Sequence, residues 1–355
     1  MLIPATISLL ISTIFLNLGL VTSNIFFHPQ KAEAAEKVLG VVEYNNVDNI
    51  FVEAAVDKLN QSIVRVTEGA RQFSVPALPQ LPGVDLPLNS LPQSSDKQEK
   101  DNHETANFDL PAESGVIYDL STGELFFNKG ADRAWPIASI TKLFTAYTFL
   151  DYNPGWETIY EIKAEDKRDG GKIYLFNGDR VKVRDLFYFS LVGSDNTATA
   201  ALVHSTGMSE SEFVEKINNK IKQLGLVNTR LADAVGLNPD NVSTAREIAL
   251  FAKTALAAPD ISRAALTKSY EFTTEQGRKK LINSTNLLLN KFPENGVNIL
   301  GGKTGFIDSS GYCLVGRFKN QTGSEIVTVV LGAASDNDRF DLTKKMVELY
   351  YGARP

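Results

Sequence analysis

The sequence predicts an α/β fold of the α+β kind, with an antiparallel sheet flanked by helices and a helical subregion beside it. Strand-like runs lie at both ends of residues 114–355, whereas helical periodicity fills the middle. Short turns at 121–123 and 320–323 join neighbouring runs, and such turns connect antiparallel strands. The expected strands are 115–120, 124–128, 299–306, 312–318 and 325–331.

The expected helices follow from apolar residues recurring at three- and four-residue steps. Between the first helix and the others, residues 160–183 carry short polar strands around Gly170-Gly171, which predicts a surface excursion. After the helix that begins near Ser139, the expected helices are 183–192, 197–204, 211–224, 244–257 and 336–351.

Composition and charge exclude several classes of function. The net charge is −6 and no basic stripe is visible, so we expect no nucleic-acid partner. The three histidines, His28, His103 and His204, are far apart and lack metal-ligand spacing, so we expect no metal and no cofactor. The one cysteine, Cys313, permits no intramolecular disulfide and is expected to be a buried strand residue.

The N-terminal residues 1–30 contain no Asp, Glu, Lys or Arg. Residues 2–21 are mostly apolar and long enough to span a bilayer, which predicts a signal peptide or a membrane anchor. Ala32-Glu33-Ala34 fits a small-x-small cleavage site, although it lies far from the apolar stretch. We expect export with retention at the membrane, and clean secretion is the alternative.

Two further segments precede the folded domain. Residues 31–71 form a membrane-proximal region in which 46–67 has the periodicity of an amphipathic helix. Residues 72–113 are rich in proline and then in polar residues, so they read as a linker that tethers the domain 114–355 away from the membrane.

Residues 136–143 place Ser139 and Lys142 three positions apart at the start of an apolar run, so both would lie on one helix face. Pro136 suits the first turn of a helix, and Ser139 would then lie near the positive end of the helix dipole. Desolvation of Lys142 by the apolar run would let it lose its proton near neutral pH and act as a base. Ser-x-x-Lys also occurs often by chance, so the motif needs support from the rest of the chain.

Two other motifs follow in the chain. Ser194-Asp195-Asn196 lies on a loop between two expected helices, and alone it is typical of an ordinary helix cap. Lys303-Thr304-Gly305 lies at the end of an expected strand, and alone it is typical of a strand that ends in a glycine-lined turn.

Together the three motifs resemble the signature set of penicillin-recognising serine enzymes. Their flanks resemble the low-molecular-weight D-alanyl-D-alanine carboxypeptidases, serine peptidase family S11. The matching stretches are 136–143, 231–247 and 302–312, within a resemblance that covers residues 114–352. The resemblance implies a penicillin-binding-protein or serine β-lactamase-like fold. Two features depart from the family pattern: Ser-Gly-Asn is commoner there than Ser-Asp-Asn, and we expect the N-terminal segment to take the place of the C-terminal anchor that many relatives carry.

The resemblance implies a role for each motif residue in acyl transfer. Ser139 is the nucleophile, Lys142 the base and Ser194 the group that passes a proton to the leaving amine. Asn196 binds the substrate peptide, and Lys303 binds the terminal carboxylate and lowers the pKa of Lys142 by like-charge repulsion. The other expected substrate-binding residues are Thr304, Gly305, Phe306, whose N–H completes an oxyanion hole with that of Ser139, and Arg339, which matches a carboxylate-binding arginine of relatives.

The implied enzyme is a serine-type carboxypeptidase that removes the terminal D-alanine from peptidoglycan stem peptides in the bacterial cell envelope, with β-lactams as covalent inhibitors. Three alternatives remain open: a β-lactamase, a D,D-endopeptidase and a non-catalytic wall-binding protein. Class A β-lactamases deacylate with a glutamate between the second and third motifs, and residues 231–238 contain none. The intact motif residues argue against the wall-binding protein.

Overall fold

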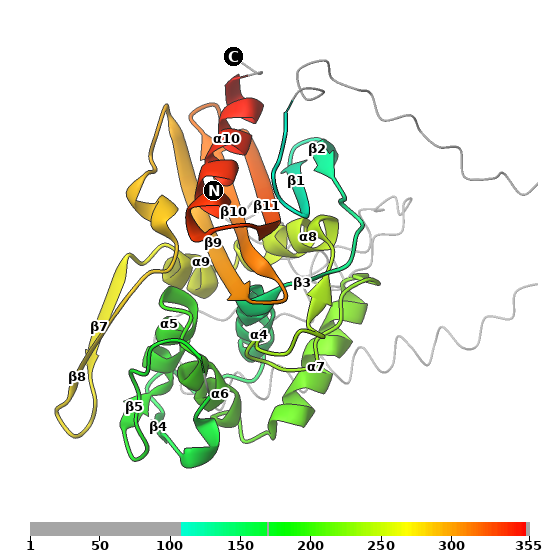
Figure 1. Cartoon of the computed structure of the whole chain (residues 1–355). Coiled ribbons are helices and arrows are strands. Elements are labelled where there is room, and N and C mark those ends of the chain that lie inside the picture. Colours follow the sequence, from blue (N-terminus) through cyan, green and yellow to red (C-terminus); the bar gives the residue numbers. More distant parts are fainter. Residues whose placement is uncertain (1–107, 169, 353–355) are drawn as a thin grey trace, which may run out of the picture. The chain divides into compact units, whose positions relative to one another are not determined.

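The computed structural model describes residues 108–168 and 170–352 (Figure 1). The apolar N-terminal segment, the predicted helix 46–67 and most of the predicted linker lie outside these residues. The predicted antiparallel sheet is confirmed. Its five strands have the order β2-β1-β11-β10-β9, and every pairing in it is antiparallel. The bounds are β1 Ser114–Asp119, β2 Leu125–Lys129, β9 Val297–Ile307, β10 Gly311–Asn320 and β11 Glu325–Ala333.

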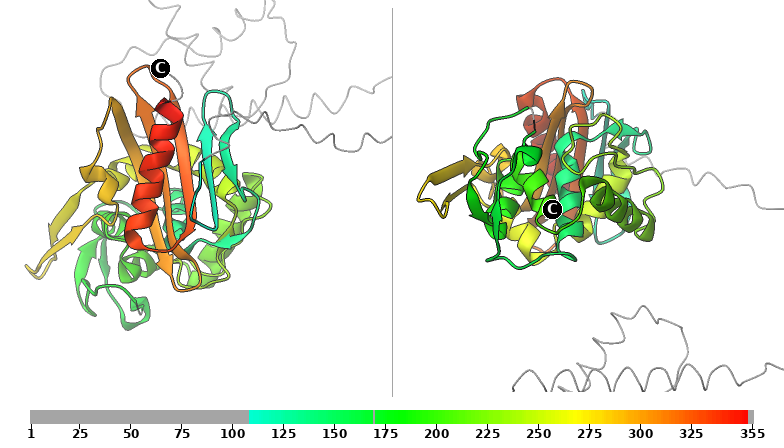
Figure 2. Two further views of the ribbon diagram at one scale, coloured as in Figure 1. Left: turned by 45° about the horizontal axis from the view of Figure 1, so that its top comes forward. Right: turned by 90° about the horizontal axis from the view of Figure 1, so that it is seen from below.

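Helices cover both faces of this sheet, because alternate residues of each strand face opposite sides. On β1, for example, Val116 packs into a core with the central helices, whereas Ile117 packs into a second core with α10. Figure 2 shows α10 along one face, and the buried residues of α4 to α9 belong to the core on the other face. The helices are η2 Ala138–Ile140, α4 Thr141–Phe149, η3 Ala164–Asp166, α5 Val183–Val192, α6 Asn196–His204, α7 Glu210–Gln223, α8 Ala245–Ala255, α9 Pro259–Ala265, η4 Leu287–Asn290 and α10 Asp336–Gly352.

The segment between α8 and β9 contains elements that the sequence did not reveal. Helix α9 spans only seven residues, too few for a periodic pattern. The hairpin of β7 (Ser269–Thr273) and β8 (Lys279–Asn283) projects from the body of the domain (Figure 1) and therefore buries few side chains. The remaining short strands are β3 Trp135–Pro136, β4 Ile159–Glu161, β5 Arg180–Lys182 and β6 Val242–Ser243.

The expected helical position of Pro136 is wrong. Pro136 lies in β3 and pairs with Val242 of β6, and the helical turn starts at Ala138. The extended pairing fits the restricted backbone of a residue pair that contains proline. The motif serine therefore lies on a 3₁₀ turn that leads directly into α4.

Packing at the N-terminal side begins before Ser114. Leu110 is only 1% exposed and its carbonyl accepts a hydrogen bond from Lys129 Nζ at 2.7 Å. The ring of Phe108 packs edge-on against Phe127. The last residues of the predicted linker are thus part of the folded domain.

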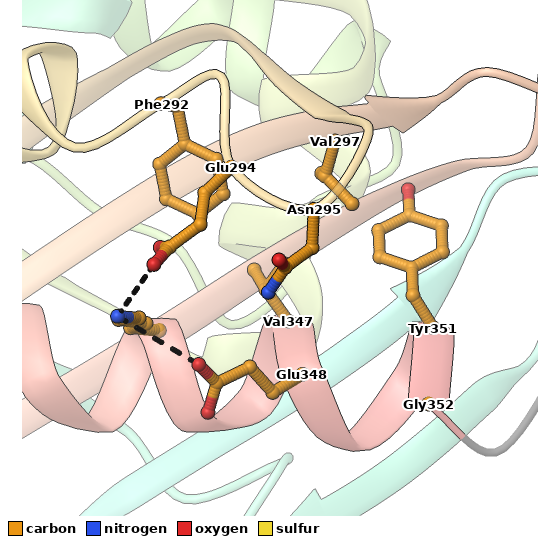
Figure 3. A pocket seen from close by; sticks show the side chains of 9 residues that line it. Phe292, Glu294, Asn295, Val297, Val347, Glu348, Tyr351 and Gly352 are labelled. Atoms are coloured by element: carbon orange, nitrogen blue, oxygen red, sulfur yellow. Dashed lines mark hydrogen bonds and ion pairs between the residues drawn. The ribbon is translucent and has the colours of Figure 1, made fainter.

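A cavity of about 290 Å³ lies at the end of α10 (Figure 3). Its wall includes Phe292, Val297 and Tyr351, and Lys344 bridges Glu294 at 2.9 Å and Glu348 at 3.8 Å. The motif residues do not line this cavity. The described residues contain no helix with the length and apolarity needed to cross a membrane.

We expect Thr328→Val to stabilise the protein. The hydroxyl of Thr328 is fully buried in β11 and has no hydrogen-bond partner among the described residues. An unpaired buried hydroxyl costs about 1–3 kcal/mol, so its replacement by a methyl group should raise Tm by a few degrees in thermal unfolding.

The matched control for this prediction is Thr145→Val. Thr145 is equally buried, but its hydroxyl donates to the Ala234 carbonyl at 2.6 Å. Its loss should lower Tm, because the carbonyl would be left without that donor. A fall in Tm for both variants would contradict the prediction.

Candidate active site

The first motif joins a serine to a fully buried lysine. Lys142 Nζ lies 3.0 Å from Ser139 Oγ, 2.9 Å from Asn196 Oδ1 and 2.7 Å from the Val235 carbonyl oxygen. The lysine is 0% exposed and sits on the first turn of α4. The structure therefore brings together the first motif, the second motif and the loop that precedes β6.

These three partners suit a neutral amine. A neutral Nζ has two N–H groups and one lone pair. The two N–H groups match Asn196 Oδ1 and the Val235 carbonyl, which only accept. The lone pair is then left for the hydroxyl proton of Ser139, so the geometry fits Lys142 as the base.

Burial is the largest cause of the lowered pKa of Lys142, which falls to about 7. The negative charges of Asp195 and Asp233 oppose this shift. This burial agrees with the desolvation that the apolar run after Lys142 predicts, whereas repulsion from Lys303 is not among the causes of the shift. Repulsion from Lys142 is instead one cause, after burial, of the strongly lowered pKa of Lys303.

Asp233 organises the turn that supplies the Val235 carbonyl. Its carboxylate accepts hydrogen bonds from the backbone N–H groups of the next residues in the turn and from Asn241 Nδ2. Gly236, at φ +93°, leaves no room for a Cβ, which would lie 2.3 Å from the Ala138 carbonyl oxygen. The turn thus packs directly beneath Ser139. An Asp followed by Gly three positions later was the available sequence signal for this role.

The second motif combines a cap with a strained serine. Asp195 is the N-cap of α6, with its side chain accepting from Ala198 N at 2.6 Å. The helix cap predicted for this motif is therefore present, next to the Ser194–Lys303 contact. Ser194 has φ +57°, in the left-handed region, and its Oγ accepts from Lys303 Nζ at 2.8 Å. Asn196 Nδ2 donates to the Gly170 carbonyl at 3.1 Å, which fixes the orientation of its amide.

The third motif lies on β9, an outer strand of the sheet, and faces the helical subregion. Lys303 is 1% exposed and also donates to the Thr304 carbonyl at 3.0 Å. A Cβ on Gly305 would lie 2.8 Å from the Ile137 carbonyl oxygen and 3.2 Å from Ser139 N. Glycine thus lets β9 approach the backbone of the serine turn, next to Phe306, which is 45% exposed.

Arg339 lies on α10 and is 7% exposed. Its Nη1 donates to the Gly305 carbonyl at 3.0 Å, it pairs with Asp336, and its guanidinium lies over the Tyr312 ring. The structure therefore places Arg339 against the backbone of the third motif, where its charge also lowers the pKa of Lys303.

Two residues with strained backbones flank the lysines. Ala138 has φ +46° and Ser194 has φ +57°, and such conformations in non-glycine residues cost about 1–3 kcal/mol each. Ala138 precedes Ser139, and Ser194 contacts Lys303. Strain of this kind clusters at functional sites, which supports this group of residues as the active site.

Comparisons with known proteins agree with the geometry. The family model of Peptidase_S11, described as D-alanyl-D-alanine carboxypeptidase, matches residues 99–335. A D-alanyl-D-alanine endopeptidase of Haemophilus influenzae is 33% identical over 67% of this chain and 82% of its own. The D-alanyl-D-alanine carboxypeptidase DacF of Bacillus subtilis is 30% identical over 74% of this chain and 68% of its own.

Solved structures show the same fold. Penicillin-binding protein D2 of Listeria monocytogenes, in a cefotaxime-bound form, has a TM-score of 0.60 at 29% identity. A variant of the Streptomyces K15 DD-transpeptidase has a TM-score of 0.63 at 26% identity. Each comparison covers 69% of this chain and 99% of the other.

We expect the rate at which a fluorescent penicillin acylates Ser139 to fall as the pH falls below about 7. The pKa of Lys142 is about 7, and only its neutral form accepts a proton. Below that pH the rate should drop about tenfold per unit. Burial raises the pKa of Asp195 to about 6, so the acidic limb of the pH–rate profile reflects the titration of both groups. Stopped-time labelling between pH 5 and 9 measures it. A flat profile would count against Lys142, and Lys142→Arg, always protonated, should remain unlabelled throughout.

Removing the charge of Asp233 should move this limb to lower pH. The Asp233 charge raises the pKa of Lys142, so Asp233→Asn should lower that pKa. A purely structural role would reduce the rate equally at every pH. Asp240→Asn, which removes an exposed charge from the same turn, is the control and should leave the limb in place. An unmoved limb in Asp233→Asn would contradict the electrostatic role.

Proposed function

The chain belongs to peptidase family S11, the D-alanyl-D-alanine carboxypeptidases, and from this premise we propose that it cleaves the D-Ala-D-Ala bond of peptidoglycan stem peptides through an acyl-enzyme on Ser139. The observation that carries the proposal is the pair of serine–lysine contacts, Ser139 with Lys142 and Ser194 with Lys303, whose two lysines lie near enough to repel each other.

Acylation starts at Ser139. As its Oγ attacks the carbonyl carbon between the two D-alanines, the hydroxyl proton passes to the neutral Nζ of Lys142. The resulting oxyanion is held by the backbone N–H groups of Ser139 and Phe306, which the close approach at Gly305 supports. The depressed pKa of Lys142 makes this proton transfer possible near neutral pH.

Release of the terminal D-alanine requires a proton on the leaving nitrogen. Ser194 Oγ is hydrogen-bonded to Lys303, so its hydroxyl proton is free to be donated to that nitrogen. The C–N bond then breaks, and Ser194 regains a proton from the protonated Lys142. Asn196 holds the peptide, and Lys303 with Thr304 binds the free carboxylate.

Water then hydrolyses the ester and restores Ser139. In the turn where class A β-lactamases carry a glutamate base, the carboxylate of Asp233 is occupied by backbone N–H groups. It is therefore not available to activate water. This argues for slow release of β-lactams and against the β-lactamase alternative.

A D,D-endopeptidase that cuts cross-links is the second candidate. The similarity to the H. influenzae endopeptidase favours it, because the match covers 82% of that protein but only 68% of the B. subtilis carboxypeptidase. Both reactions use the same nucleophile, base and acyl-enzyme, so the two differ only in the amine that leaves.

We place the reaction outside the cytoplasmic membrane, in the cell envelope, where the family acts on peptidoglycan. The apolar residues 1–30 and the proline-rich linker support a tether that holds the domain 114–355 near its substrate. β-Lactams fit as covalent inhibitors, and a structural relative, penicillin-binding protein D2 of L. monocytogenes, binds the β-lactam cefotaxime.

We expect Ser139→Ala to abolish both covalent labelling by a fluorescent penicillin and release of D-alanine from an L-Lys-D-Ala-D-Ala peptide. Alanine lacks the nucleophilic oxygen, whereas the fold should persist because Ser139 lies on a turn held by its backbone. Gel fluorescence and a D-alanine assay measure the two activities, and a cross-linked muropeptide substrate tests the endopeptidase.

The wild-type results separate the alternatives. Rapid penicillin turnover without peptide cleavage would favour a β-lactamase, and cleavage of cross-links alone would favour the endopeptidase. Absence of both labelling and cleavage would favour a wall-binding protein.

A further inference from the structure

We propose that Thr285 is a specificity-determining residue which, together with Thr304, recognises the free carboxylate next to the scissile bond. The inference rests on the proposed function. Thr285 belongs to none of the three motifs and lies between β8 and η4. Its Oγ1 is 2.6 Å from Thr304 Oγ1.

The backbone holds Thr285 firmly at the cleft. Its N–H donates to the carbonyl of Val192, the last residue of α5, at 3.0 Å. The preceding N–H, of Ser284, donates to the Lys268 carbonyl at 2.8 Å. The segment thus connects the end of the helix before Ser194 with the third motif, and its hydroxyl position is fixed by the fold.

The proton count of the hydroxyl pair makes Thr285 more than a neighbour. Two hydroxyls carry two protons, and their mutual hydrogen bond uses one. The second proton is left for an acceptor. If Thr304 donates to a carboxylate, Thr285 must donate to Thr304; if Thr285 donates to the carboxylate, Thr304 must donate to Thr285. In both arrangements the two residues act as one donor.

Exposure makes Thr285 the more accessible member of the pair. Thr304 is 3% exposed, whereas Thr285 is partly exposed. An incoming group therefore meets Thr285 as well as Thr304.

The charges around the pair favour an anion. Lys303 Nζ donates to the Thr304 carbonyl at 3.0 Å, and Arg339 donates to the next carbonyl, of Gly305, at 3.0 Å. The amine of Lys303 and the cationic guanidinium of Arg339 therefore both lie along the backbone that carries Thr304. A terminal carboxylate is the anionic group of a D-Ala-D-Ala substrate.

A second buried polar group lies on the same side of β9. Asn286 is 4% exposed, its Nδ2 has no hydrogen-bond partner among the described residues, and a Cβ on Gly302 would lie 3.0 Å from it. Residues 285–286 therefore present one hydroxyl and one amide donor to the strand that binds the substrate. Both groups can donate hydrogen bonds, which suits a carboxylate, because a carboxylate only accepts them.

The test compares two substrates with the full-length chain. Thr285→Val keeps the shape of the side chain and removes the hydroxyl. A neutral hydrogen bond contributes about 0.5–1.5 kcal/mol, so KM for L-Lys-D-Ala-D-Ala should rise about 2- to 13-fold with kcat within about twofold. The C-terminal amide of the same peptide keeps a carbonyl acceptor but lacks the charge, so its KM should rise less than that of the acid. Thr285→Ser should restore the wild-type KM.

Controls separate recognition from folding. Thr328→Val makes the same chemical change in β11, away from the cleft, and should leave both substrates unaffected. Thr285→Ala, measured alongside with its Tm, guards against misfolding of the valine variant. Equal losses on the acid and amide substrates, a loss in kcat alone, or no change in KM would overturn the inference. Wild-type protein that releases no D-alanine and binds no penicillin would overturn the proposed function as well.

Discussion

Burial of two lysines is the constraint on which the candidate active site depends. Lys142 and Lys303 are almost completely removed from water, and desolvation is the largest cause of the lowered pKa of each. Water would return Lys142 to its ordinary pKa and make it useless as a base near neutral pH. The cleft is therefore built from elements whose common property is that they exclude solvent from these two amines.

The elements that achieve this come from distant parts of the chain. The Ser139 turn before α4, the loop before α6, the Asp233 turn and β9 each contribute residues around the two lysines. Glycines at 236 and 305 allow backbone to touch backbone, because a Cβ at either position would overlap the turn of Ser139. Tight packing of this kind holds the strained Ala138 and Ser194 in place.

The same packing decides which carboxylates take part in chemistry. Asp195 is occupied as a helix cap and Asp233 as the organiser of a turn, so both act on Lys142 through charge. Their charges hold the pKa of Lys142 near neutrality against the effect of burial. With both carboxylates occupied in this way, the site suits acylation of the serine, followed by slow hydrolysis of the acyl-enzyme that a β-lactam would form.

The sequence by itself determined the sheet, the helix 183–192 to the residue, and the three motifs, because local periodicity and fixed spacings carry that information. It did not reveal the extended pairing of Pro136, the hairpin 269–283, or the roles of Asp233, Val235 and Thr285. Those depend on contacts between residues remote in the chain: a backbone carbonyl at 235 reaches Lys142, and a hydroxyl at 285 reaches Thr304. The apolar run after Lys142 predicted its desolvation, but the complete burial of the amine was decided by tertiary structure, because Asn196 and the Val235 carbonyl close around it from other parts of the chain.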